Sequence, residues 1–226
     1  INDNMARVLS VLLGAAFHIL RFGHLMHHKL NRSWQSELVE QDTLLAKVNY
    51  YVTLMGGLYI SEILGSVTMS LLPRRLFIWL ASKGALTGHP EIRTAGERFF
   101  YVKGHAARVR IDTLCIFLLY GASFALYGDA YGFLLLFMGS RAFVVSFMDN
   151  IYHYGTPGDN SQAGKDLALP WFAEKLVLNS NYHDTHHRNP QLAWIYLRSM
   201  HRRQRTAFKG DFISHGLLQF RGPIKL

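Results

Sequence analysis

Two long apolar runs near the middle of the chain restrict its fold more than any other feature. They occupy residues 111–127 and 131–148, and the turn-forming sequence Gly128-Asp-Ala-Tyr-Gly132 joins them. A helix needs about 17–25 apolar residues to cross a bilayer, and only helices and closed barrels satisfy their backbone polar groups there. The runs therefore predict a transmembrane helical hairpin in an integral membrane protein of the all-α class.

The sequence repeats one histidine pattern, His-x-x-His-His, at two distant places. It occurs at His24-Leu-Met-His27-His28 and again at His183-Asp-Thr-His186-His187. On a helix, positions i, i+3 and i+4 lie within about 100° of one another, so the three imidazoles of each box share a face. Adjacent histidines diverge by a similar angle, so each box can offer nitrogens to two metal ions. Two facing boxes would form a dinuclear site, and imidazole suits iron, zinc and copper.

A shared metal site limits how the other apolar segments cross the membrane. The 111–148 hairpin crosses the membrane twice and so returns the chain to the side from which it started. If both boxes lie on one side, a single crossing by residues 50–72 would separate them, so these residues cannot cross alone. Either these residues form a re-entrant or interfacial element, or residues 74–81 belong to a second crossing. Because the apolar piece 76–81 is short for a span, we expect a re-entrant or shallow hairpin. Gly56, Gly57 and Gly65 would permit the bend.

Other segments carry simpler expectations. Residues 5–22 should form one helix that leads directly into the first visible box. Residues 173–197 should be largely helical up to the second box, and residues 206–226 should be basic and irregular.

The chain carries a formal net charge of +9, and much of it gathers next to the second box. The cluster comprises Arg198, Arg202, Arg203, Arg205 and Lys209. A cytoplasmic loop that obeys the positive-inside bias would look like this, and so would a docking face for an acidic electron-transfer protein. The apolar runs and the lack of nucleic-acid-binding motifs argue against a nucleic-acid partner.

Cys115 is the single cysteine, which excludes an internal disulfide, a Cys-ligated zinc and an iron–sulfur site.

The layout resembles the membrane-bound fatty acid desaturase and hydroxylase superfamily of di-iron enzymes. Its first visible box resembles the second histidine box of that family, and His183, His186 and His187 resemble the third. The segment Asp149-Asn-Ile-Tyr-His153-Tyr-Gly155 is similar to a segment of membrane alkane hydroxylases whose histidine is a further metal ligand, so the resemblance assigns that role to His153. The family's first box has no counterpart here. We therefore interpret residues 1–226 as a single-domain fragment whose N-terminal spans and first box lie before Ile1.

The resemblance also implies an activity. Two iron ions, O2 and electrons from a separate ferredoxin- or rubredoxin-type donor would remove hydrogen from a fatty acyl chain in the membrane. The outcome could be a double bond or, after decarboxylation of a free fatty acid, a 1-alkene. A hydroxylase or ketolase acting on alkanes or carotenoids is an alternative within the superfamily. A non-catalytic membrane metal-binding or transport protein is an alternative of another class. The di-metal site would lie between membrane helices and a cytosolic cap, on the cytoplasmic face.

Three carboxylates are candidates for catalytic or supporting roles. Glu62 is the only charged residue of the 50–72 run, and a carboxylate at membrane depth is usually paired or functional. Asp149 lies four residues before His153 and could orient its imidazole. Asp184 lies inside the second box, although either aspartate could equally be a helix-end carboxylate. The histidines outside the boxes and the His153 segment are expected to be solvated or packed rather than ligands: His18, His89, His105, His201 and His215.

Overall fold

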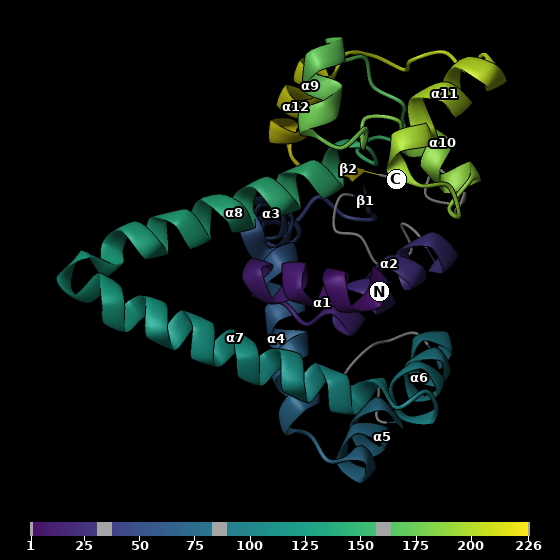
Figure 1. The fold of residues 1–226 in the computed structure, drawn as a ribbon. Coiled ribbons are helices and arrows are strands. Elements are labelled where there is room, and N and C mark those ends of the chain that lie inside the picture. Colours follow the sequence, from purple (N-terminus) through teal and green to yellow (C-terminus); the bar gives the residue numbers. More distant parts are fainter. Residues whose placement is uncertain (1, 31–37, 83–89, 157–163, 226) are drawn as a thin grey trace. The chain divides into compact units, whose positions relative to one another are not determined.

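A computed structural model of the chain describes residues 2–30, 38–82, 90–156 and 164–225 (Figure 1). Almost all of its regular structure is helical, as the apolar runs predict. The chain divides into two compact units. Unit 1 comprises Ile1–Met26 with Tyr59–Ser140, and unit 2 comprises His27–Leu58 with Arg141–Leu226. His89 and the glycines around it lie outside the described residues.

The N-terminal segment of unit 1 is two helices rather than the one expected over residues 5–22. Helix α1 (Asn2–Leu13) and helix α2 (Phe17–Leu30) are bent by 98° at the residues between them. Gly14 adopts a φ of 82°, which ends α1, and Ala16 is fully buried and donates its backbone N–H to Ser66 Oγ. The prediction of one continuous helix missed this bend because a lone glycine within an apolar run is a weak signal.

The rest of unit 1 packs around an aromatic core. Helices α5 (Arg74–Ser82) and α6 (Pro90–Gly96) and the π-helix Glu97–Val102 lead into α7 (His105–Tyr127). The buried core residues are Ala16, Met69, Phe99, Phe100, Ala106 and Val109. Buried Asp112 is paired with Arg7, whose Nη2 lies 2.6 Å from Asp112 Oδ1.

The predicted hairpin is present. Helix α7 reverses through a 3₁₀ turn, Gly128–Ala130, into α8 (Tyr131–Ile151) (Figure 1). At about 1.5 Å per residue, each helix is longer than the roughly 30 Å hydrocarbon core. Two stretches are long and apolar enough to cross a membrane, Leu44–Leu71 and His105–Ile151, and the bent α1–α2 pair would be a third if it forms one span.

The Leu44–Leu71 stretch is more continuous than the shallow hairpin expected for it. It consists of α3 (Leu44–Val52), the π-helix Thr53–Gly57 and α4 (Leu58–Leu71). The bend lies at Gly56, one of the glycines proposed for it, where φ is 129°. A Cβ atom at this position would lie 3.1 Å from the Cβ of Ala142, so glycine serves both the backbone conformation and the close contact with α8. A re-entrant path for this stretch stays a prediction.

Unit 2 carries the second box on short helices. They are α9 (Trp171–Leu176), α10 (His183–Arg188), α11 (Trp194–Gln204) and α12 (Phe212–Leu218). The helix expected up to the box instead ends at Leu176, and Leu178 and Asn179 adopt positive φ angles of 52° and 55°. The tail is also more ordered than expected. It forms α12 and a strand, β2 (Ile224–Lys225), that pairs in parallel with β1 (Leu38–Val39).

Extended segments between these helices hold unit 2 together. Asp166 and Tyr182 form an antiparallel bridge, and Ala168 and Asp211 form a parallel one. Leu167 is fully buried, and its N–H donates to the carbonyl of Asn181. Residues 165–168 therefore join the chain just before the box to the chain just before α12.

Candidate metal centre

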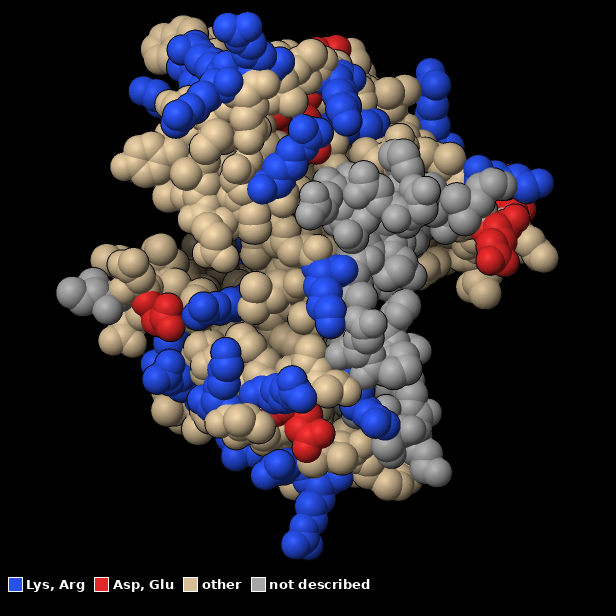
Figure 2. Space-filling model, turned by 90° about the vertical axis from the view of Figure 1, so that its right-hand side faces the viewer, with Lys and Arg blue, Asp and Glu red and all other residues tan. Residues whose placement is uncertain are grey.

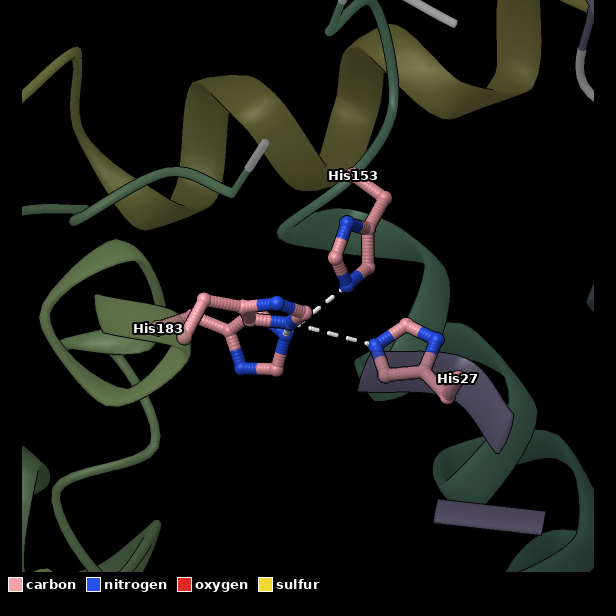
Figure 3. A group of neighbouring side chains, drawn as sticks. His27, His153 and His183 are labelled. Atoms are coloured by element: carbon pink, nitrogen blue, oxygen red, sulfur yellow. Dashed lines mark hydrogen bonds between the residues drawn. The ribbon is translucent and has the colours of Figure 1, made fainter. Parts of the chain in front are cut away.

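Four imidazoles converge in unit 2, and they come from three separate elements. His27 lies on α2, His153 follows the end of α8, and His183 and His187 lie one turn apart on α10. One ring nitrogen from each lies within 4.8 Å of the others. Figure 3 shows the rings of His27, His153 and His183 pointing toward one another. The sequence separation between α2 and α10 means that tertiary folding alone assembles this group.

The nitrogens of the four rings are spaced as metal ligands would be. The Nε2 atoms of His153 and His183 are 2.8 Å apart, those of His183 and His187 are 3.0 Å apart, and those of His187 and His27 are 3.2 Å apart. Ligands about 2.0–2.1 Å from one ion lie roughly 2.8–3.0 Å apart when adjacent in octahedral geometry and roughly 3.3–3.4 Å apart in tetrahedral geometry. The observed spacings fall between the lower and upper ends of these values.

Hydrogen bonding alone does not account for this convergence. A nitrogen of a neutral imidazole carries either one hydrogen or one lone pair, so it forms one regular hydrogen bond. The Nε2 atoms of His183 and His187 each face two other Nε2 atoms. A cation at the centre would accept all four lone pairs at once.

Burial prepares these rings to act as ligands. His153 is fully buried, and the side chains of His187 and His27 are 3% and 9% exposed. The pKa of His183 is lowered well below its usual value, first by burial and then by the neighbouring imidazoles of His153 and His187. A neutral imidazole keeps the lone pair that a metal ion needs.

A second group begins beside the first. The Nε2 atoms of His28 and His186 are 3.0 Å apart. His28 follows His27 on α2 and His186 precedes His187 on α10, so each pair of adjacent histidines divides between the two groups, as their divergence on a helix predicts. His24 lies one turn before His28 on α2, with an exposed side chain.

The position of His153 is fixed by the end of α8. Its N–H donates to the carbonyl of Asn150, and Asn150 in turn donates through Nδ2 to Gln219 Oε1 at 2.7 Å. The preceding Tyr152 stacks on the ring of His183, with centroids 4.7 Å apart, and its hydroxyl lies 2.7 Å from Ser180 Oγ. The chain around His153 therefore contacts α10 before any metal is considered.

Two buried carboxylates brace the second box, and sequence reasoning did not find either. Asp166 accepts from the backbone N–H of Thr185 at 3.0 Å and from its hydroxyl at 2.6 Å, and it also lies 2.7 Å from Nδ1 of His201 on α11. Glu174 accepts from the hydroxyl of Tyr182 at 2.6 Å. The hydrogen bond and negative charge of Glu174, together with burial, raise the pKa of Tyr182 to about 12, with burial the largest cause.

Arg198 forms an ion pair with one of these two buried carboxylates. Its Nε lies 3.2 Å from Glu174 Oε2, and the Glu174 side chain is only 5% exposed. Arg198 was grouped from the sequence with the arginines of an exposed basic surface. Its pairing with a buried carboxylate gives it a structural role, and its part in the basic surface stays a prediction.

The three candidate carboxylates lie in different surroundings. Glu62 of unit 1 is half-buried, and a Cβ atom at Gly23 would lie 4.0 Å from its Oε1, so its carboxylate lies beside α2 next to the residue that precedes His24. Asp149 is half-buried in the last turn of α8. Asp184 is buried and forms an ion pair with Arg188 at 2.8 Å. Burial raises the pKa of Asp184, and Arg188 opposes that shift. Their catalytic roles stay predictions.

The other described histidines are packed. His18 is fully buried in unit 1 and stacks on His105, with ring centroids 4.0 Å apart. His201 is buried beside Asp166, and His215 lies 3.3 Å from Lys165 Nζ through its Nε2. Among the described residues, none of these four belongs to a group that could hold a metal ion.

The sequence was compared with models of known protein families, with curated protein sequences and with solved structures. A family model described as fatty acid desaturase matches residues 1–215. The chain is a member of the fatty acid desaturase family. No curated protein sequence and no solved structure matches it.

Family membership and structure together establish the general character of this member of the family. It is a mainly α-helical integral membrane protein, with helices long and apolar enough to span the bilayer and with a histidine cluster of metal-binding type. At the level of the family it is a desaturase-type oxidase, an oxidoreductase that acts on lipid. The resemblance drawn from its histidine boxes is confirmed.

Proposed function

We propose that this chain is an O2-dependent di-iron oxidase that removes hydrogen from a fatty acyl chain. The observation that carries the proposal is the convergence of four Nε2 atoms from α2, the end of α8 and α10. Four neutral imidazoles with no cysteine form a donor set that suits iron, zinc or copper. The desaturase family favours iron among these.

The residues present fit one metal ion well. His27, His153, His183 and His187 would hold it, because their Nε2 atoms are spaced 2.8–3.2 Å apart along the chain of contacts. A structural zinc needs only four ligands, and the further histidine pair beside this group argues for more than one ion. The second ion would be held by His28 and His186, with His24 as the third imidazole, because positions i and i+4 share a face of α2.

Bound iron would supply O2 activation for cleavage of an unactivated C–H bond. The chain's own residues would orient the ligands and keep them neutral. Burial disfavours protonation of His183, and Tyr152 holds the plane of its ring by stacking. Glu62 and Asp149 would orient histidines from the second layer around the metals. The apolar helices α7 and α8 would give a long acyl chain a surrounding in which it is soluble.

Electrons would come from a separate protein. Exposed basic side chains follow the box on α11 and its C-terminal side, and Lys and Arg side chains gather along the upper edge of the face in Figure 2. The exposed members near the box are Arg202, Arg203, Arg205 and Lys209. A ferredoxin- or rubredoxin-type donor, commonly acidic, would be attracted to this basic surface. The same charges would hold the box on the cytoplasmic side.

Hydroxylation is the second candidate outcome. It is favoured by His153, whose segment resembles that of membrane alkane hydroxylases and whose Nε2 lies 2.8 Å from that of His183. Decarboxylation of a free fatty acid to a 1-alkene is a third outcome of the same hydrogen removal. The alternatives differ in product and not in the histidine site.

Product analysis tests the proposal. Cells that express the full-length protein are fed fatty acids, alkanes or carotenoids, and their lipids and headspace are analysed by mass spectrometry. We expect an O2-dependent unsaturated, hydroxylated or 1-alkene product that is absent from cells expressing His183→Ala. An unchanged product profile in both, at equal protein levels, would contradict an oxidase and favour a non-catalytic metal-binding protein.

A further inference from the structure

One short segment of unit 2 contacts both the turn that carries His153 and the helix that carries His183, although none of its residues belongs to either histidine group. It comprises Gly164, Lys165 and Asp166 and leads into the bridge between Asp166 and Tyr182. The side chains of Lys165 and Asp166 contact different neighbours.

Asp166 faces the second box. Its carboxylate is 1% exposed and accepts both the N–H and the hydroxyl of Thr185, which lies between His183 and His186. The same Oδ2 atom that accepts from the hydroxyl also contacts His201. Thr185 is fully buried, so no water competes for these bonds. The carboxylate thus fixes the helical turn of α10 between two box histidines.

Lys165 faces the end of α8. Its Nζ donates to the carbonyl of Tyr154 at 2.6 Å, and Tyr154 directly follows His153. The same Nζ lies 3.3 Å from His215 Nε2. Burial lowers the pKa of His215 and the ammonium of Lys165 lowers it further, so this ring is neutral and can accept the hydrogen bond.

Gly164 brings the segment into direct contact with the box. It is buried, and a Cβ atom there would lie 3.3 Å from His183 Cδ2 and 3.3 Å from the backbone N of Asp184. Such contacts are tight enough that the imidazole of His183 would have to shift by a few tenths of an ångström. Glycine therefore allows a closer approach to the His183 ring than alanine would.

We propose that Gly164, Lys165 and Asp166 act as positioning residues that set the separation of His153 from His183. His183 lies on α10 and His153 lies in the turn after α8, and their Nε2 atoms are 2.8 Å apart. Metal ligands need to be held to within about 0.5 Å of the productive geometry by residues that are themselves fixed. Asp166 holds α10, Lys165 holds the turn after α8, and the peptide bond between them ties the two together.

This inference rests on the proposed metal site, so its test measures metal binding directly. The metal-free full chain in detergent is titrated with Co²⁺, whose visible absorption reports both affinity and ligand geometry. The variants are Asp166→Asn, Thr185→Val, Gly164→Ala and Lys165→Met. Thr185→Ser is the conservative control, because it keeps the hydroxyl that Asp166 accepts. Asp211→Ala is the structural control, because it removes the carboxylate that caps α12 through the N–H of Ser214 and leaves the box untouched.

We expect Asp166→Asn to bind Co²⁺ about 10–100-fold more weakly and with an altered absorption band, as loss of an outer partner of a metal site does. Thr185→Val should behave similarly, and Thr185→Ser and Asp211→Ala should match the wild type. Gly164→Ala should change the band more than the affinity. If wild type binds Co²⁺ and all four test variants bind it identically, the positioning role is overturned while the metal site stands. If wild type does not bind Co²⁺, the proposed function itself fails. Thr185→Val keeps the test decisive should Asp166→Asn not fold.

Discussion

The α10 region and the α7–α8 hairpin follow opposite rules. Around α10 many of the buried side chains are polar or ionisable, among them Asp166, Glu174, Asn181 and Thr185. Along the hairpin the large exposed side chains are apolar, and they include Leu118, Leu126, Phe133 and Leu136. The first region gains its order from buried polar contacts such as those of Asp166 with Thr185, whereas the outer surface of the second is soluble in lipid. One chain therefore combines a polar interior at its site with an apolar exterior where it crosses the membrane.

Removal of a buried box histidine should have the largest effect. His187 is 3% exposed, and its Nε2 faces those of both His27 and His183. We expect His187→Ala to abolish turnover and to lower bound iron, and His186→Ala to do the same through the second group. His105→Asn is the matched control, since it removes an imidazole of unit 1 outside either group. Full activity of His187→Ala would remove that residue from the site.

The second largest effect is expected when a lysine is introduced into the hairpin, and the same substitution near the site should have little effect. Leu118 on α7 and Tyr196 on α11 are similarly exposed, at 65% and 56%. We expect Leu118→Lys to cost about 3–4 kcal/mol of membrane insertion for a position at the bilayer centre, and Tyr196→Lys to cost almost nothing. Insertion efficiency of glycosylation-tagged chains measures the difference. Equal tolerance at both positions would mean that α7 does not face lipid.

The sequence predicted some parts of this comparison well. The hairpin and both boxes were found because apolar runs and His-x-x-His-His follow local periodicities that survive in the folded chain. Asp166 and Glu174 were missed because their partners lie 8–35 residues away and no local pattern marks a buried carboxylate. The 98° bend before α2 and the loop before α10 depend on single backbone conformations at Gly14, Leu178 and Asn179. His153 was identified by family resemblance and not by spacing.

Charge reversal on the basic surface should have an intermediate effect that depends on salt. We expect Arg202→Glu with Arg203→Glu to slow donor-supported turnover by about tenfold or more at low ionic strength. The defect should shrink as salt rises, because charges are screened over about 8 Å at physiological ionic strength. Turnover driven by peroxide or by a small chemical reductant should change much less.

Arg198→Ala is the informative comparison for that experiment. Arg198 pairs with buried Glu174, so its loss should lower stability and metal retention without a salt-dependent defect. An equal, salt-dependent loss in both variants would show that Arg198 also serves the docking surface. An equal loss with either reductant would assign the arginines to folding, lipid contact or binding of a substrate carboxylate.

The smallest effect is expected at a buried hydrogen bond of the α3 core, which is linked to the His153 turn only indirectly, through Asn150 and Gln219. Tyr50 is 1% exposed and donates through its hydroxyl to the carbonyl of Gln219 at 2.7 Å. Tyr50→Phe should cost about 0.5–1.5 kcal/mol in the free energy of unfolding and leave the bound metal unchanged. Thermal unfolding followed together with metal analysis checks both parts. Loss of metal in this variant would show that the α3 core and the site are coupled more tightly than their contacts indicate.

X-ray absorption at the iron edge of the purified full-length protein, with metal content measured on the same sample, tests the central claim most directly. The four-imidazole group formed by His27, His153, His183 and His187 predicts bound iron with a nitrogen shell at about 2.1 Å and the outer-shell scattering typical of imidazole rings. The second histidine group predicts two iron ions per chain. A protein that retains no iron after expression with iron supplied, or whose iron has a shell without imidazole scattering, would contradict this account.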